Sequence, residues 1–377
     1  MIDTATLAFL LALAVGAALI SIKLGLSVAI VEIVIGILAG NLLGFKTAGH
    51  DWLLFLAGLG SVVLTFLAGA EIDPEAMRKD WKASISIGTL SFLAPFLGTL
   101  AIAYLLLGWT WPASLLAGVA LSTTSVAVVY VVLVESGASR TPTGKLILSA
   151  CFVTDLGTVV ALSLLFIRPN IYILVMLAAL AISIIVLPRM LSWLFSRLNG
   201  RSGEPEVKIC LLIVVLLGVS AEIAGSHAVL PAYILGLVLA STLARNRAVL
   251  VKLRTISLSF LTPFFFIAAG LNVSLAAVAA SLGLVALLFS VKVGAKFIGV
   301  LPACKKFVGR DSVYITLLMS TGLTFGTISA QYGLSMGIID QNQFSVLVMV
   351  VMLTAIVPTI IAQRWFKPEM PAEREKQ

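Results

Sequence analysis

The 377-residue sequence predicts an all-α integral membrane protein of about thirteen transmembrane helices, and three features support this fold class. Hydrophobic residues make up 60% of the chain and charged residues only 11%, whereas soluble domains carry roughly 25% charged residues. Apolar runs of about 20 residues recur along the whole chain, and each is long enough to cross a hydrocarbon core of about 30 Å as a helix. Lysine and arginine gather in alternate loops between these runs.

The predicted spans follow one another with short loops, and none has the alternating polarity of a barrel strand. The first span lacks the basic start and the small-residue cleavage site of a secretory signal peptide, so we interpret it as a helix of the protein. We expect one transmembrane domain over residues 1–367 and a short cytoplasmic tail at 368–377. The predicted spans are 5–23, 26–43, 52–71, 82–107, 113–136, 143–167, 171–197, 206–225, 227–244, 257–271, 275–301, 312–337 and 343–365.

The distribution of positive charge predicts the orientation of the chain. With the N-terminus outside, the outer loops carry only Lys46 and Arg168, and the inner loops carry the other loop cations. We therefore expect a multi-pass protein of the inner (plasma) membrane with an outer N-terminus and a cytoplasmic C-terminus. The net charge of +8 is then an orientation signal, and we expect the lipid bilayer and no nucleic acid as a partner. The inner-loop cations are Lys23, Arg78, Lys79, Lys82, Arg140, Lys145, Arg197, Arg201, Lys208, Arg245, Arg247, Lys252, Arg254, Lys305, Lys306 and Arg310.

Few ionisable side chains lie inside the predicted spans, where each costs at least about 2.5 kcal/mol and is a functional candidate. Asp155 lies in the middle of the sixth span, within SACFVTDLGTVVALS. Lys292 and Lys296 lie four residues apart in the eleventh span and so share one helix face. Glu32 and Glu222 lie nearer span ends, where a structural ion pair or hydrogen bond competes with ion binding as their role. We expect Asp155 to be the central group and the two glutamates to support it.

Two spans carry clusters of hydroxyl residues at their centres. The fifth span contains Thr123, Thr124 and Ser125, and the twelfth contains MSTGLTFGT, with Thr324 as a supporting candidate. Such clusters can serve close helix packing alone, but polar segments at corresponding places in two halves of a chain are typical of broken helices around a central site. An odd number of crossings separates the two spans, so a repeat that relates them is inverted. We therefore predict inverted repeats over approximately 26–167 and 227–365, with two broken helices that cross.

Several segments, in this order, resemble a known family. They include EIVIGILAGNLLG in the second span, ALSTTSVAVVYVVLVESG in the fifth, SACFVTDLG in the sixth and AKFIGV in the eleventh. Their order and spacing over nearly the whole chain are similar to those of the monovalent cation:proton antiporter-2 family, whose members have the sodium/proton antiporter fold. The resemblance implies that fold and a homodimer.

The resemblance also implies a site. The ion-binding aspartate of the family falls on Asp155, and its lysine falls on Lys296, with Lys292 as the competing alignment. Electrogenic members of the family have two adjacent acids in the sixth span, whereas this chain has Thr154 before Asp155. The resemblance therefore implies one site acid in this chain, with either lysine as the charge-coupling group.

The residues and the resemblance together predict a secondary antiporter that exchanges Na⁺ or K⁺ for protons by alternating access. The Asp155 carboxyl group can hold a proton or a transported monovalent cation, the latter with hydroxyl oxygens of Thr154 and of the fifth-span cluster. Because a bare charge crosses the bilayer centre at high cost, competition for one site couples the two ions. A single acid favours electroneutral exchange.

Three other functions compete with this prediction. An organic-anion symporter of the same fold would need a neutral or basic site, which Asp155 disfavours, and a passive cation channel would not need a deep carboxylate. An intramembrane metalloprotease would need a motif such as HExxH, and an aspartyl protease would need two deep aspartates; neither pattern is present. The three cysteines show no metal-ligand or paired spacing, so we interpret them as packing residues. We expect no cofactor and no enzyme activity.

Overall fold

The computed structural model describes residues 4–24, 27–47, 49–72, 80–135, 138, 141–166, 172–198, 203–223 and 228–366, and its regular elements there are helices. Ten of the described helices are long and apolar enough to cross a membrane, and Val28–Leu42 and Leu230–Arg245 are shorter apolar helices. Contacts divide the chain into two compact units, each assembled from separate stretches of the sequence. The first unit is Met1–Gly16, Lys46–Pro74 and Val159–Ala268, and the second is Ala17–Phe45, Glu75–Thr158 and Ala269–Gln377.

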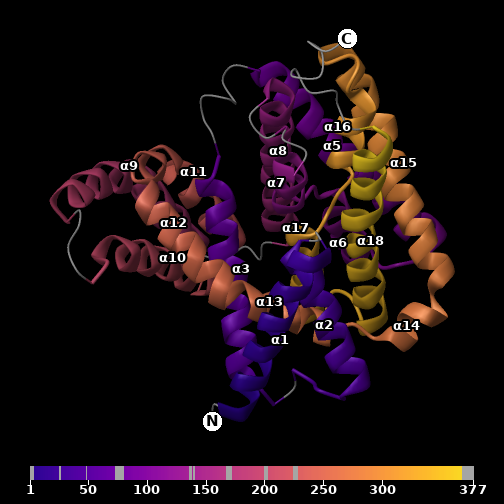
Figure 1. Ribbon diagram of the computed structural model, residues 1–377, viewed down its shortest axis with the longest axis horizontal. Helices are drawn as coiled ribbons and strands as arrows, with labels where there is room; N and C mark the ends of the chain where they lie inside the picture. The colour runs from indigo at the N-terminus through magenta and orange to yellow at the C-terminus, as the bar shows by residue number, and fades with distance from the viewer. Residues whose placement is uncertain are drawn as a thin grey trace. The chain divides into compact units, whose positions relative to one another are not determined.

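The first unit is a bundle of apolar helices in which α3 and α11 pack along each other. Its helices α9 and α10 pack together, and both contact α11 (Figure 1). Phe66 of α3 and Phe195 of α9 lie in its core, and both are fully buried. Helices α1 (Thr4–Leu24), α8 (Pro142–Phe166) and α13 (Thr262–Leu271) continue across the boundaries of the units along the chain. The other helices of the first unit are α3 (Asp51–Ala70), α9 (Tyr172–Leu198), α10 (Pro205–Ile223), α11 (Val229–Arg245), α12 (Arg247–Ile256) and the π-helical turn η3 (Ser257–Leu261).

Glycines allow α3 and α11 to approach closely. A Cβ atom on Gly69 of α3 would overlap the carbonyl oxygen of Tyr233, and one on Gly236 of α11 would overlap that of Phe66. These neighbours are backbone atoms, so they cannot move aside as a flexible side chain could. Small residues at such contacts are typical of helix packing in membranes, where van der Waals contact rather than the hydrophobic effect holds helices together.

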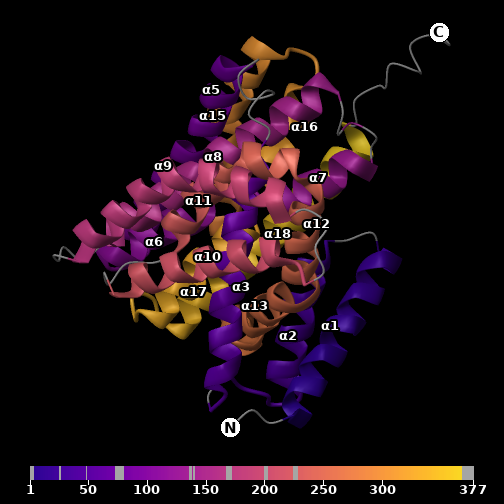
Figure 2. The ribbon, with the colours of Figure 1, turned by 90° about the vertical axis from the view of Figure 1, so that its left-hand side faces the viewer.

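The second unit contains every described helix with a break at its centre. Its helices α5 and α15 run side by side in both views (Figures 1 and 2), and α5 also packs on α6. The half-helix α17 contacts both α6 and α18. The helices of the second unit are α2 (Val28–Leu42), α5 (Trp81–Ala101), the π-helical turn η1 (Ile102–Leu106), α6 (Trp111–Ser122), α7 (Val126–Glu135), α14 (Leu275–Ala280), α15 (Leu282–Phe307), α16 (Ser312–Met319), α17 (Thr324–Ser335) and α18 (Gln341–Trp365).

Each predicted span coincides with helical structure among the described residues, with two differences in the bounds. The tenth span, predicted at 257–271, belongs to an apolar stretch that runs over Arg247–Leu271. Its first half was not predicted, because α12 is amphipathic and carries the charges of Arg247, Lys252 and Arg254. The eleventh span, predicted at 275–301, consists of the short α14 and then α15, which begins only at Leu282. The predicted tail at 368–377 lies outside the described residues.

Candidate functional site

Two helices of the second unit are interrupted, and each interruption exposes backbone groups. α6 ends at Ser122 and α7 begins at Val126, with Thr123 in an extended conformation. α16 ends at Met319 and α17 begins at Thr324. The last turn of any helix has carbonyl groups without partners inside the helix, so each break needs donors from elsewhere. At membrane depth water does not supply them, and other parts of the protein must.

The two breaks supply these partners to each other. Thr124 Oγ1 donates to the carbonyl oxygen of Met319 at 2.9 Å, and the Ser125 N–H donates to Thr321 Oγ1 at 3.4 Å. All four residues are buried. The prediction of two broken helices that cross is therefore confirmed, and the hydroxyl clusters of the fifth and twelfth spans meet at this crossing.

The remaining hydroxyls of the crossing are bonded within their own helices. Thr123 Oγ1 donates to the carbonyl oxygen of Ala120 at 3.1 Å. Ser125 Oγ accepts from the Val128 N–H at 3.4 Å, which caps the start of α7. A hydroxyl has one hydrogen to donate and two lone pairs, so Thr123 keeps acceptor capacity after its bond to Ala120. The crossing thus presents oxygen atoms that a cation can use.

Lys296 of α15 is held at the crossing by three acceptors. Its Nζ donates to Ser91 Oγ of α5 at 2.6 Å, to Thr124 Oγ1 at 2.9 Å and to the carbonyl oxygen of Ser122 at 3.0 Å. The last of these is a carbonyl at the end of α6, where a positive charge is favoured by the helix dipole. Lys296 is fully buried, and all three protons of its ammonium group have partners.

Asp155 of α8 lies buried near this lysine. Its side chain is 2% exposed, and within the described part of the protein its Oδ1 has no hydrogen-bond partner. The carboxyl group is close enough to Lys296 for an electrostatic interaction, but no ion pair within 4.0 Å joins them. The neighbouring Thr154 donates its hydroxyl to the carbonyl oxygens of Ala150 and Gly88, at 3.1 Å and 3.2 Å. Asp155 therefore offers an unused buried oxygen, whereas Thr154 connects α8 to α5.

Lys292 is as deeply buried as Lys296 but is bonded differently. Its Nζ has no hydrogen-bond partner among the described residues. The ammonium group lies against Gly322 in the break between α16 and α17, and Thr123 Oγ1 borders the same place. The structure thus brings both candidate lysines to the crossing, one with its protons bonded and one without.

The three supporting candidates belong to helices α2, α10 and α17. Glu32 is buried in α2, and its Oε2 has no partner in the described part of the chain. Glu222 lies in α10 of the first unit, and its side chain is outside the described part. Thr324 is the first residue of α17 and is half-buried. No hydrogen bond that the structure describes connects Glu32 or Thr324 to Asp155 or to the lysines.

Sequence analysis missed several residues of the crossing. Ser91 accepts from Lys296, the carbonyl oxygen of Met319 accepts from Thr124, and Gly322 borders Lys292. A single serine in the apolar run of α5 is a weak signal, and a backbone carbonyl leaves no signal in the sequence. For the end of α6, the one indication in the sequence was that Ser122 directly precedes the candidates Thr123 and Thr124.

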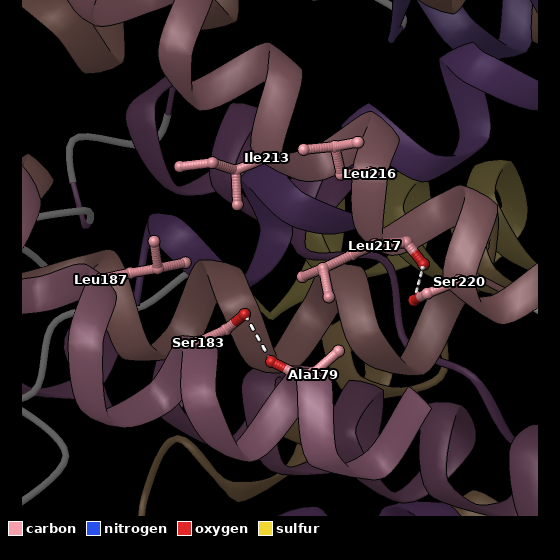
Figure 3. Close-up of a pocket in the computed structure, with 7 residues that line it drawn as sticks. All are labelled: Ala179, Ser183, Leu187, Ile213, Leu216, Leu217 and Ser220. Atoms are coloured by element: carbon pink, nitrogen blue, oxygen red, sulfur yellow. Dashed lines mark hydrogen bonds between the residues drawn. The ribbon is translucent and has the colours of Figure 1, made fainter. Parts of the chain in front are cut away.

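A groove of about 240 Å³ between α9 and α10 is not a comparable site (Figure 3). Its two hydroxyls, those of Ser183 and Ser220, each donate to a carbonyl oxygen of their own helix at 2.7 Å. The rest of the lining is aliphatic, so the groove offers no charge and few free oxygen atoms to a cation. The lining residues are Ala179, Ser183, Leu187, Ile213, Leu216, Leu217 and Ser220.

Comparison with known proteins gives consistent relatives. The family model described as "Sodium/hydrogen exchanger, transmembrane" matches residues 9–367. A probable Na⁺/H⁺ antiporter 3 of Methanocaldococcus jannaschii is 27% identical over 90% of this chain and 89% of that protein. The Na⁺/H⁺-K⁺ antiporter GerN of Bacillus cereus is 24% identical over 90% of this chain and 89% of its own length. The structure of the sodium proton antiporter MjNhaP1 from M. jannaschii aligns with a TM-score of 0.71 and 16% identity, over 97% of this chain and 99% of that chain, which confirms the predicted fold.

Proposed function

Because the chain belongs to the sodium/hydrogen exchanger family, we propose that it exchanges a monovalent cation for protons across a membrane by alternating access. The observation that carries the proposal is the Asp155 carboxyl group, buried beside two crossed helix breaks with its Oδ1 unbonded within the described residues. The names of the relatives support this class of transport over an anion symporter or a channel.

The proposed mechanism rests on competition at Asp155. The carboxyl group holds either a proton or a transported cation, and the cation completes its coordination with oxygens of Thr123, Thr124 and Ser125 at the crossing. Either occupant neutralises the carboxylate, and a neutral site crosses the low-dielectric region at lower cost than a bare charge. The empty, ionised site does not cross readily. Proton and cation must therefore alternate, and that alternation is the coupling between the two gradients.

Replacement of Asp155 by Asn tests the proposal. The amide keeps the size of the side chain but can neither take up a proton nor carry the negative charge that the cation needs. We expect Asp155→Asn to abolish exchange, by at least about 100-fold in rate if charge stabilisation at the site is lost. The measurement is dissipation of a pH gradient in proteoliposomes after addition of Na⁺, K⁺ or Li⁺.

Asp340→Asn is the matched control, because Asp340 caps the start of α18 through Gln343 and Asn is also a good helix cap. It makes the same chemical change outside the crossing and should keep exchange. A folded Asp155→Asn protein that exchanges ions at the rate of the wild type would refute the proposal. Cation flux without proton movement in the wild type would instead identify a channel.

The transported cation is Na⁺ or K⁺. The names of the relatives support both, since one is named for Na⁺ and another for Na⁺ and K⁺.

We further propose an outer N-terminus and a cytoplasmic C-terminus in the plasma membrane, supported by the asymmetry of Lys and Arg between loops. A homodimer is supported by the resemblance to the antiporter family alone. Reporter fusions at each terminus test the orientation, and cross-linking of the purified protein in membranes tests the dimer.

A further inference from the structure

Two buried lysines meet at one helix crossing, but among the described residues the crossing contains one buried carboxyl group, that of Asp155. Lys292 and Lys296 lie one helical turn apart on the same face of α15, so their like charges repel. Lys296 is compensated by its three acceptors, one of them a carbonyl oxygen at the end of α6. Lys292 has no such acceptor within the described part of the protein. A fully buried ammonium group without a hydrogen bond is costly, so its retention needs an explanation.

The place of this ammonium group depends on a glycine. A Cβ atom on Gly322 would overlap Lys292 Nζ and would lie 2.9 Å from Thr123 Oγ1. Gly322 lies in the break between α16 and α17, where no helix would otherwise restrict the residue. Any side chain at this position would therefore compete with the ammonium group for the same space. Thr123 Oγ1, which borders the same space, is one of the oxygens that we assign to the transported cation.

We propose that Gly322 and Lys292 act as a pair that lowers the affinity of the site for the transported cation. The missing side chain of Gly322 leaves room for the ammonium group at the crossing, and its positive charge beside Thr123 opposes a second monovalent cation there. The division of roles between the lysines follows: Lys296 fastens α15 to α5 and α6, and Lys292 acts on the cation. This inference rests on the proposed function and adds a determinant of its cation affinity.

The test is a double-mutant cycle of Lys292→Met and Gly322→Ala in proteoliposomes. Methionine keeps the apolar stem of lysine but ends short of the ammonium group and carries no charge. Loss of the opposing charge should lower the KM for the cation by about three- to tenfold. Gly322→Ala should lower KM in the protein with Lys292, because the methyl group displaces the ammonium group. In the Lys292→Met protein only the contact of the methyl group with Thr123 remains, so Gly322→Ala should not lower KM there.

Thermal unfolding of the same four proteins gives a second readout that does not need transport. The methyl group of Gly322→Ala should lower the midpoint more when Lys292 is present than when methionine has removed the ammonium group from that space. Gly326→Ala is the matched control on the same broken helix, since its Cβ would contact Val351, the carbonyl oxygen of Ala120 and Thr123 Oγ1 but not Lys292. Its effect on the midpoint should be the same in both backgrounds.

The outcomes separate this inference from the proposed function. A wild-type protein that exchanges ions while Lys292→Met leaves KM unchanged or raises it would overturn the inference alone. So would an equal effect of Gly322→Ala in both backgrounds, which would mean that the glycine and the lysine are independent. Absence of exchange by the wild-type protein would overturn the proposed function, and the inference with it.

Discussion

Lys292 and Lys296 show how two residues of one type, one turn apart on α15, can have different roles. Both are fully buried, but Lys296 Nζ donates to three oxygen atoms, and Lys292 Nζ donates to none among the described residues. Lys296 donates to Ser91 of α5, to the carbonyl oxygen of Ser122 at the end of α6 and to Thr124 within the break that follows. Its first role is therefore to hold three elements of the second unit in register.

This difference predicts that replacement of Lys296 costs more stability than replacement of Lys292. Lys296→Met should destabilise the protein by about 2 kcal/mol, because the acceptors at Ser91 and Ser122 lose a charged donor in a buried place. Activity should fall and its pH profile should shift, since Asp155 loses the nearby positive charge. Thermal unfolding and pH-dependent exchange in vesicles measure both. Lys292→Met is the comparison, and a larger loss of stability in that variant than in Lys296→Met would contradict this assignment.

At the residue scale the sequence could predict which side chains matter but not how they are bonded. Asp155, Lys292 and Lys296 stand out because ionisable groups in apolar runs are rare and costly. The choice between the lysines depends on Ser91, which is more than 200 positions away in the sequence and resembles any other small residue of a span. Thr154 remains a candidate ligand, and the donation of its hydroxyl to the carbonyl oxygens of Ala150 and Gly88 could not be predicted from the sequence.

At the scale of elements, close backbone contact between α3 and α11 makes a prediction for the first unit. Gly69→Val places side-chain atoms where the carbonyl oxygen of Tyr233 and the amide nitrogen of Leu237 lie, and backbone atoms cannot turn away. We expect a loss of about 1–3 kcal/mol or more in stability and a loss of exchange. The midpoint of thermal unfolding in detergent measures the first effect, and vesicle transport measures the second.

The control for this substitution lies on the same helix. A Cβ atom on Gly58 of α3 would have no heavy atom within 4 Å, so Gly58→Val introduces the same side chain into open space. It should change the midpoint little and leave exchange intact. Equal destabilisation by the two substitutions would mean that valine weakens α3 itself and that the contact with α11 is not the cause.

The elements were predictable where a local pattern defines them. Hydroxyl clusters predicted both broken helices, because a break at membrane depth needs side-chain oxygens and small residues near it. The start of the tenth span was misplaced, because α12 carries three cations on an amphipathic helix that continues into the apolar α13. The partner of each break could not be predicted from local sequence, because Thr124 bonds to Met319 across 195 positions.

At the scale of the whole molecule, the sequence predicted inverted repeats, whereas the contacts define two units that each combine several separate stretches. The second unit contains Asp155, both lysines and both breaks. Hydropathy identifies each membrane span separately. It cannot assign the spans to units, because that assignment depends on which helix faces pack against each other. The repeats over 26–167 and 227–365 remain a prediction.

The number of charges moved per cycle is a property of the whole protein, and Thr154 bears on it. Where electrogenic relatives have a second acid, this chain has a hydroxyl that donates to Gly88 and Ala150, so Asp155 is the one carboxyl group at the crossing among the described residues. If both lysines keep their protonation states through the cycle, one proton exchanges for one cation and no net charge moves. We therefore expect the rate of sodium/proton exchange to be insensitive to a membrane potential.

The measurement compares two kinds of proteoliposomes that contain valinomycin. In one, balanced K⁺ clamps the potential at zero, and in the other a K⁺ gradient imposes a potential. A protonophore control establishes that the pH signal responds to proton movement under both conditions. A rate that changes strongly with the imposed potential would refute the one-for-one count and would identify a lysine of α15 as a second proton carrier, with Lys296 the first to replace.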